Sequence, residues 1–448
     1  MPWLEAALSE TASYPSPTSL STFESHIDPV WIDEALEATG TATLRRRRLP
    51  AEQVVWLVLG MALMRDRPMR DVVSNLDLVL PGSKPGKKVA TSTIAQARQR
   101  VGPAPLRWLF ERCAFEWSKK SAANHPWREL TVFALDGSTL RVADSEENRN
   151  HFGLADGRSE SGYPLVRLAA LIAARSHLIV AAAFGPYHNS EHHYAKDLWS
   201  SIPPNSVTLV DRNFLAANIL LGIQNGPNRH WLVRAKSNTK WTIVKKLGTD
   251  DLLVELAVSD SARAQDRSLP KTYLARAVAY QLDRSKPKQW LLTSLLDRSL
   301  YPAADIIALY HERWEIELAY DEIKTHQLDR VETIRSRSVK GVEQELWGIL
   351  ITFNLVRLEM EQIAKEADVP PSRISFTTAM RFIRDEWSWC AVASPGSIPA
   401  KLRRMRENVL DFVLPERRRE RRFPRAVKIK MSNYARKRRT PPSKGPAK

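Results

Sequence analysis

The pattern of apolar and polar positions divides the chain into a helical first part and a mixed α/β second part. Residues 1–25 are rich in Ser, Thr and Pro and predict a flexible leader. In residues 26–125 apolar positions recur at helical spacing, and Pro50 stands where the start of a helix tolerates its missing N–H. An all-α N-terminal domain is therefore expected. Its predicted helices are 31–38, 51–64, 69–80 and 91–100.

From about residue 130, short β-branched and apolar runs alternate with helical stretches, which predicts an α/β layer. Four short apolar runs separated by polar turns then indicate a β-rich insertion, after which helices return. The predicted strands are 131–135, 164–175, 177–184, 207–210 and 230–235, with helices at 192–201 and 214–224. The expected domains are the α/β core at 126–235, the insertion at 236–304, the rest of the core and C-terminal helices at 305–400, and a tail at 401–448.

Charge changes the picture most at the C-terminal end. The chain carries 67 Lys and Arg against 50 Asp and Glu, a formal net charge of +17. Residues 401–448 hold 18 of these basic residues and four acids, so this segment supplies +14 of the total. Such a tail is typical of an arm that binds nucleic-acid phosphates, although a solvated tail without a partner has the same composition.

Other global features favour a cytoplasmic protein without a membrane segment. The longest apolar run, residues 165–174, contains Arg167 and falls well short of the roughly 18 residues that a span needs. No signal peptide is visible at the N-terminus. Only Cys113 and Cys390 occur, and no Cys/His group has zinc spacing. A reducing, cytoplasmic location is the expectation.

One helix of the N-terminal part has the side chains of a DNA reader. Residues 91–100 follow a Pro- and Gly-rich loop at 81–88 and present Gln96, Arg98 and Arg100, which suit base edges and phosphates. A short helix, a loop and a polar helix also fit a helix-turn-helix. An ordinary exposed helix is the competing interpretation.

Two aspartates follow short apolar strands. Asp136 opens the sequence DGST, and Asp211 opens DRNF. Carboxylates at the ends of neighbouring strands project into the crevice where α/β sheets bind ligands, and Mg²⁺ prefers such hard oxygen ligands. Aspartate is also a common turn residue, so either residue alone is compatible with a purely structural role.

A third acid lies on a predicted helix at residues 309–327, LYHERWEIELAYDEIKTHQ, which contains neither Pro nor Gly. At about 100° per residue, Tyr310, Arg313, Glu317 and Lys324 share a face about 60° wide. Glu317 would complete a metal site with the two aspartates, while Arg313 and Lys324 would hold phosphates. Asp321 lies on the same face and is a rival acid. Arg313 and Glu317 also have the spacing of a simple surface ion pair.

The spacing Tyr310-x2-Arg313-x3-Glu317-x6-Lys324 resembles the Tyr-Arg-Glu-Lys signature of the insertion-sequence-four (IS-four) family of bacterial DDE transposases. The DGST and DRNF motifs, the β-rich insertion and the N-terminal helices are similar to the corresponding parts of that family, over about residues 25–435. The resemblance implies a ribonuclease-H-like catalytic core. It implies that Asp136, Asp211 and Glu317 bind two Mg²⁺ (or Mn²⁺) ions for cleavage at transposon ends and strand transfer into target DNA.

The resemblance has further implications for partners. Transposon-end DNA and target DNA are the expected substrates, with a homodimer in the synaptic complex. The resemblance also implies a bacterial, nucleoid-associated protein. Cleavage through a DNA hairpin would require a flipped base stacked on an aromatic ring, for which Trp290 and Trp241 are candidates. Arg212 is a candidate contact to the DNA backbone, with a role in a turn as the equal alternative, and Trp314 is expected to pack in the core. Two alternatives stay open here: an inactive DNA-binding regulator, and a structure-specific nuclease of the same fold.

Overall fold

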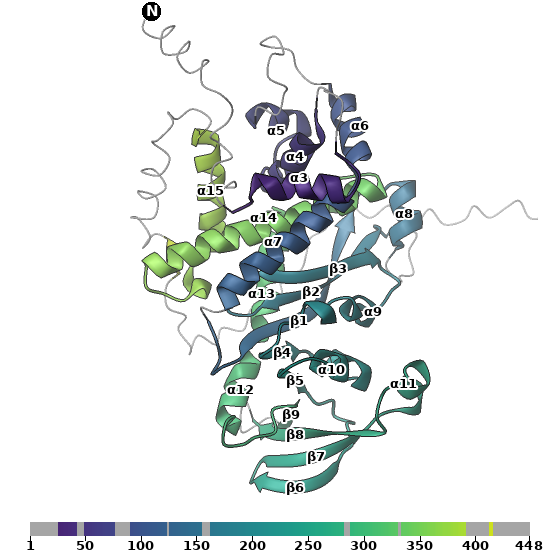
Figure 1. The fold of residues 1–448 in the computed structure, drawn as a ribbon, viewed down its shortest axis with the longest axis vertical. Helices are drawn as coiled ribbons and strands as arrows, with labels where there is room; N and C mark the ends of the chain where they lie inside the picture. The colour runs from purple at the N-terminus through teal and green to yellow at the C-terminus, as the bar shows by residue number, and fades with distance from the viewer. Residues whose placement is uncertain are drawn as a thin grey trace, which may run out of the picture. The chain divides into compact units, whose positions relative to one another are not determined.

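The computed structural model describes residues 26–42, 49–76, 90–122, 125–154, 162–281, 287–329, 333–390 and 412–414 (Figure 1). The predicted leader, the loop at 81–88 and nearly all of the predicted basic tail lie outside these residues. Within the described residues, no helix is both long enough and apolar enough to cross a membrane.

One mixed sheet extends through the described strands in the order β3-β2-β1-β4-β5-β9-β8-β7-β6, and the short β10 pairs with β1. The pairs β1–β4 and β4–β5 are parallel, whereas β1–β2 and β2–β3 are antiparallel. The mixed α/β class is therefore confirmed. The strands are β1 (Thr131–Val142), β2 (Leu165–Ala173), β3 (Ile179–Pro186), β4 (Ser206–Val210), β5 (Arg229–Arg234), β6 (Thr242–Gly248), β7 (Asp251–Ala257), β8 (Thr272–Tyr280), β9 (Gln289–Thr293) and β10 (Thr333–Ile334).

Helices connect and cover these strands (Figure 1). The α-helices before the insertion are α3 (Pro29–Ala38), α4 (Ala51–Leu63), α5 (Met69–Asn75), α6 (Thr91–Val101), α7 (Ala104–Ala122), α8 (Glu146–Phe152), α9 (Glu191–Lys196) and α10 (Ala217–Gln224). Those within and after it are α11 (Asp260–Gln265), α12 (Ala303–His311), α13 (Trp314–Asp321), α14 (Val339–Glu366) and α15 (Phe376–Cys390). Short turns are η2 (Trp199–Ser201), η3 (Arg212–Phe214) and η5 (Pro371–Arg373), and η4 (Glu322–Gln327) is a π-helix.

The parallel centre of the sheet explains its apolar sequence. All five residues of β4 are buried, with Val207 and Leu209 fully inaccessible. A parallel strand lies between covered faces, so it reads as a continuous apolar run rather than an alternating one. This burial fixes β4 beside β1, and the functional side chains emerge where β4 ends.

The N-terminal helices share their packing with the rest of the chain. The long helix α14 packs against both α4 and α7, and residues up to Val413 form one compact unit. The helices expected at 31–38, 51–64, 69–80 and 91–100 are present as α3 to α6, with shifted ends. A separate all-α N-terminal domain is not confirmed, because apolar faces of these helices are covered by α14, which follows the whole sheet in the sequence.

The crossing of α4 and α14 is close at Gly348. A Cβ atom built on Gly348 would lie 2.8 Å from Val58 Cγ1 and 3.2 Å from the Val58 carbonyl oxygen. A larger side chain must therefore push the two helices apart. We expect Gly348→Val to lower the free energy of unfolding by about 1–3 kcal/mol, measured by urea denaturation. Gln362→Val, on an exposed turn of the same helix, should change it by no more than about 0.5 kcal/mol. Equal effects of the two changes would contradict close packing at this crossing.

The β-rich segment continues the main sheet. Its strand β9 pairs antiparallel with β5, with Leu232 opposite Thr293, and β8, β7 and β6 follow outward. A fully buried arginine, Arg276, makes two 2.7 Å hydrogen bonds to the Asp251 carboxylate inside this part of the sheet. The segment 236–304 is therefore held to the core by backbone hydrogen bonds.

Candidate active site

The two predicted aspartates lie on adjacent strands. The parallel register of β1 and β4 ends with Leu135 opposite Val210, and the next residues along the two strands are Asp136 and Asp211. Parallel strands present equivalent positions on the same side, so the two carboxylates emerge next to each other. Each accepts a short local hydrogen bond, from the Gly137 and Asn213 backbone N–H groups at 2.8 and 2.7 Å.

The expectation that both acids terminate their strands is wrong for Asp136. β1 continues to Val142, and Asp136 lies in its middle, opposite Ala170 of β2. The strand that ends here is β4, because Asp211 caps the turn η3. The opening beside Asp136 therefore arises because β4 ends at Val210, while β1 stays paired with β2 along its other edge.

Negative charge is concentrated at this opening. Burial, together with the charges of Asp211 and Glu191, raises the pKa of Asp136 to about 6, although the Gly137 N–H and Arg313 oppose the shift. The protein therefore only partly compensates the charge of this half-buried carboxylate. The site therefore favours a bound cation.

The predicted single helix at 309–327 is divided into three parts. α12 ends at His311, and α13 is followed by the π-helix η4. Between α12 and α13 the backbone hydrogen bonds join residues three apart, from Glu312 N to Leu309 O and from Ile316 N to Arg313 O. The constant 100° step assumed from the sequence therefore fails at two places. π-helical turns are uncommon and occur often at functional sites; here the π-helix contains Lys324.

Arg313 links the third predicted acid to the first. Its Nη2 atom donates to Glu317 Oε1 at 2.8 Å, and Nη1 lies 3.9 Å from Asp136 Oδ2. Burial opposes the charge of Arg313, but the bond to Glu317 and the neighbouring negative charges raise its pKa. The rival acid Asp321 is exposed and accepts a hydrogen bond from Thr325 Oγ1 at 2.7 Å. Of these two acids, Glu317 is therefore the one linked to Asp136 through Arg313.

The remaining residues of the predicted face differ in position. Tyr310 is half-buried, and burial raises its pKa to about 12, with Arg313 lowering it and the charge of Asp211 raising it. It therefore stays protonated as a hydrogen-bond donor beside the acids. Lys324 is half-buried on η4, and Arg212 is exposed directly after Asp211.

Acids on the opposite side of this helical segment hold it in place. The Arg175 guanidinium, at the turn between β2 and β3, donates two hydrogen bonds to Glu312 at 2.8 and 2.9 Å. His177 Nε2 lies 2.7 Å from Glu315 Oε2, and buried Arg357 of α14 pairs with Glu322. These three acids therefore anchor the helical segment to the β2–β3 turn and to α14.

Two further residues near Asp136 were not anticipated. The hydroxyl of buried Tyr320 donates to the Asp136 carbonyl oxygen at 2.9 Å, which ties α13 to β1 at the site itself. Gly137 leaves room for Glu191, since a Cβ there would lie 2.4 Å from the Glu191 carboxyl carbon. The glycine following Asp136 was the available signal for such a close approach.

Trp314 corrects an expectation. It was expected in the core, yet 57% of it is exposed, and the Arg313 guanidinium lies 5.1 Å from its ring centroid. Trp290 is half-buried and packs edge-to-face on Trp241, with ring centroids 5.7 Å apart. Trp314 is therefore the most exposed of the three rings and lies next to the predicted active face.

The prediction of base contacts from α6 needs one correction. Arg98 is only 8% exposed and donates to Gln344 Oε1 and to the Gly341 carbonyl oxygen, both at 3.2 Å, so its side chain is turned into the protein and away from a DNA groove. Gln96 and Arg100 are exposed, and Arg100 donates to the Leu49 carbonyl oxygen at 3.1 Å.

The residues at the opening are oxygen donors of the kind a divalent ion prefers. Across the described part of the chain, however, no three His, Cys, Asp or Glu side chains lie close enough to hold one ion. Two carboxylates are adjacent and the third is paired with Arg313. The donor chemistry fits a divalent cation provided that Glu317 leaves Arg313.

Comparison with known proteins identifies relatives over most of the chain. A model of the insertion element 4 transposase N-terminal region matches residues 17–111, and a model of the transposase DDE domain matches residues 127–355. The transposase InsG for insertion sequence element IS4 from Escherichia coli (strain K12) is 37% identical over 424 residues, 93% of each chain. The putative transposase InsZ of the same strain is 38% identical over 225 residues, 50% of this chain and 74% of that one.

A more distant relative and a solved structure complete the comparison. The putative transposase for insertion sequence element IS4SA from Synechocystis sp. is 21% identical over 316 residues, covering 70% of this chain and 82% of that one. A piggyBac transposase synaptic complex with hairpin DNA is 12% identical with a TM-score of 0.41, covering 90% and 88%; a score this low does not establish a shared fold. The two family models and the match to InsG show that the chain belongs to the IS4 family of DDE transposases, enzymes that cleave DNA and join it to new sites.

Proposed function

We propose that the carboxylates of Asp136, Asp211 and Glu317 form the catalytic metal site of a ribonuclease-H-like core. Transposases of the DDE type use divalent metal ions, and Mg²⁺ or Mn²⁺, two ions in all, is the proposed cofactor here. The observation that carries the proposal is the parallel register that ends with Leu135 opposite Val210, because it sets the two aspartates side by side. The strand order β3-β2-β1-β4-β5 around them supports the proposed core.

Arg313 fills a specific role in the metal-free chain. Its guanidinium pairs with Glu317 and lies near Asp136, so it supplies positive charge between two acids. Glu317 is 40% exposed, which leaves its side chain room to exchange Arg313 for an ion. Arg313, once released, is placed to bind a DNA phosphate, as guanidinium groups do with two parallel donors.

When bound, the ions would activate the attacking hydroxyl and stabilise the leaving oxygen. The chain's own residues position the phosphodiester group: Tyr310 donates from its protonated hydroxyl, Arg313 and Lys324 offer positive charge, and Arg212 lies exposed next to Asp211. The anchored helical segment keeps these groups in fixed relation to β1. Transposon-end and target DNA are the proposed substrates, with a homodimer at synapsis and cleavage in the cytoplasm.

The test is cleavage of a labelled duplex carrying the element's own end, with Mg²⁺ or Mn²⁺ and with a chelator. We expect metal-dependent nicking and joining of the new 3′ end to target DNA. Glu317→Gln should slow nicking by at least roughly a hundredfold. Loss of a residue that only hydrogen-bonds to a metal ligand costs up to about that much, so loss of a ligand itself should cost no less. Asp321→Asn, the matched change one helical turn away, should leave the nicking rate unchanged.

Three outcomes would overturn parts of this assignment. Failure of Asp321→Asn to nick, with activity retained in Glu317→Gln, would make Asp321 the third acid. Nicking without joining would identify a nuclease. Binding without cleavage in either metal would identify a regulator.

A further inference from the structure

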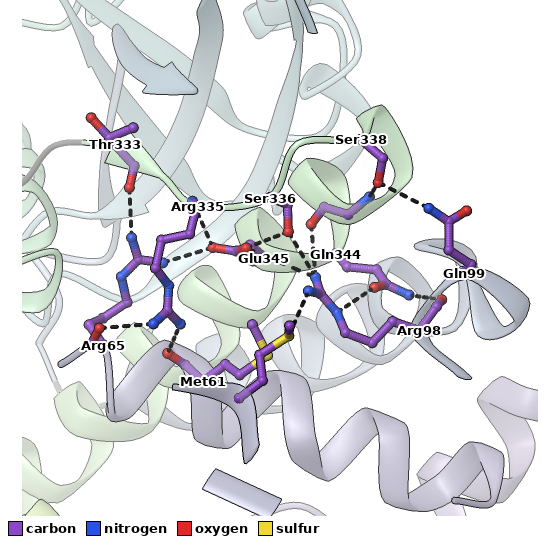
Figure 2. A network of polar contacts seen from close by, with 12 residues as sticks. Met61, Arg65, Arg98, Gln99, Thr333, Arg335, Ser336, Ser338, Gln344 and Glu345 are labelled. Carbon is purple, nitrogen blue, oxygen red and sulfur yellow. Dashed lines mark hydrogen bonds and ion pairs between the residues drawn. The ribbon is translucent and has the colours of Figure 1, made fainter. Parts of the chain in front are cut away.

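A cavity of about 470 Å³ lies where α6 meets the start of α14, apart from the proposed catalytic carboxylates. Figure 2 shows the polar network around it, in which side chains from the N-terminal helices meet the segment that leads into α14. One wall includes Met69, Arg98 and Gln99, and the other runs from Arg335 through Glu345. The cavity therefore joins two parts of the chain that are distant in sequence.

The cavity wall has an excess of positive charge. Its lining residues include Arg98, Arg335, Arg337 and Lys340, and Glu345 is the one acid among those described. Glu345 is already engaged, because it accepts from Arg65 Nη1 at 2.8 Å, from the Arg335 backbone N–H at 3.3 Å and from the Ser336 hydroxyl (Figure 2). Glu345 thus faces several guanidinium groups, and its oxygens already accept hydrogen bonds from other donors.

The guanidinium groups of Arg98 and Arg335 donate mostly to uncharged oxygens, and each keeps one nitrogen without a strong acceptor. The contact of Arg98 Nη1 is with the Met69 sulfur at 3.5 Å, and a thioether is a weak acceptor. The Nε atom of Arg335 is buried without a hydrogen-bond partner among the described residues. Burial lowers the pKa of Arg98, and burial together with the charges of Arg65 and Arg98 lowers that of Arg335. The positive charge of these arginines is therefore only partly compensated by the protein.

Two features make the cavity suitable for an anion that arrives from solvent. Arg337 and Lys340 are exposed at its edge, beside exposed Gln99. The first turn of the 28-residue helix α14, capped by Ser338, also lines it and adds the positive end of the helix dipole. Buried positive charge is therefore connected to an accessible basic rim.

We propose that this cavity, which we call the α6–α14 pocket, binds one phosphodiester group of the DNA backbone and so anchors DNA on the N-terminal helices. A single negative charge complements the excess around Glu345, and Arg337 and Lys340 approach the adjoining backbone. Exposed Gln96 on the neighbouring face of α6 then lies close to the bound duplex. This contact holds DNA independently of the catalytic carboxylates.

The decisive variant is Arg337→Ala/Lys340→Ala in the full-length chain, because both side chains are exposed and their removal spares the buried network. Binding to a labelled duplex of arbitrary sequence is measured by fluorescence anisotropy over a series of KCl concentrations. We expect roughly tenfold weaker binding, and a slope of log K against log salt that is smaller by about one for each phosphate that is no longer neutralised. Arg337→Lys/Lys340→Arg should bind as the wild type does.

The matched control is Arg267→Ala/Lys271→Ala, which removes the same charge from exposed positions between α11 and β8. Its affinity for the duplex should stay within about twofold of that of the wild type if the pocket holds the DNA backbone at a defined place. Equal weakening in the two double variants would show only general attraction to basic surface and would overturn the proposal. So would unchanged binding in Arg337→Ala/Lys340→Ala.

A free anion is the other source of the same chemistry. Millimolar inorganic phosphate is added without DNA, and thermal unfolding is followed for the wild type and for Arg337→Ala/Lys340→Ala. Stabilisation of the wild type alone, combined with normal DNA binding by the variant, would assign the pocket to free phosphate and overturn the DNA assignment. Weaker DNA binding by Arg337→Ala/Lys340→Ala supports the pocket whether or not the wild type nicks DNA. A wild type that binds DNA but does not nick it contradicts the proposed active site and leaves this binding result unchanged.

Discussion

An Asp136→Asn chain is expected to bind duplex DNA as the wild type does and to nick it about a thousandfold more slowly. The change keeps the shape of the side chain and removes the charge that would bind a cation together with Asp211. Metal ions contribute several kcal/mol of transition-state stabilisation, and about 1.4 kcal/mol corresponds to a factor of ten in rate. Single-turnover nicking of the element's own end in Mg²⁺ measures the decrease.

The variant should also keep its fold. Burial and neighbouring negative charges raise the pKa of Asp136 to about 6, so the charged carboxylate is itself unfavourable in the metal-free chain. Its replacement is expected to leave the thermal midpoint of unfolding unchanged or higher. Asp260→Asn, on the fully exposed start of α11, is the charge-matched control and should nick normally. Nicking by Asp136→Asn within tenfold of the wild type would remove this residue from the site.

The largest effect on stability is expected from Glu345→Gln. The Glu345 side chain is 3% exposed, pairs with Arg65 at 2.8 Å and lies 4.0 Å from Arg98. Removing one member of a buried ion pair leaves its partners uncompensated, which costs about 3–5 kcal/mol. Urea unfolding measures the change. Glu111→Gln, which breaks an exposed pair with Arg107, should cost less than about 1 kcal/mol.

The pH dependence of this stabilisation has a definite direction. Burial alone would raise the pKa of Glu345, but the charges of Arg65 and Arg98 and the bond from Ser336 lower it below the usual 4.5. The folded chain therefore holds the charged form to lower pH than the unfolded chain does. The contribution is complete above the ordinary glutamate pKa and disappears as the pH falls through the folded value, so the wild type and Glu345→Gln should converge in stability in acid. A difference that persists unchanged there would contradict an ionic origin.

The arrangement of the aspartates could be predicted because it follows from local rules. A short apolar run that ends in Asp211 predicts a buried strand with its acid at the end, and the parallel register brings Asp136 beside it. Glu317 was accessible from helical periodicity, since its spacing from Arg313 survives the break before α13. Each of these inferences depends on the geometry of a single helix or strand, or on a pair of parallel strands.

Two corrections involve partners that are distant in sequence. Helical periodicity cannot reveal that Trp314 is exposed, because exposure depends on what packs over α13. The polar face of α6 looked like a reading surface, but Arg98 bonds to Gln344, which lies 246 residues away. The separate N-terminal domain is not confirmed for a related reason, because α14 packs against α4 and α7.

The pairing of β5 with β9 has a consequence for shortened chains. Leu232 and its neighbours find their hydrogen-bond partners in Thr293 and the adjoining residues of β9, which belong to the inserted segment. Without that segment, β5 would become a bare sheet edge with unpaired N–H and C=O groups next to the active site, which is a template for association with other chains. The inserted segment therefore covers a sheet edge that would otherwise be open to pairing with another chain.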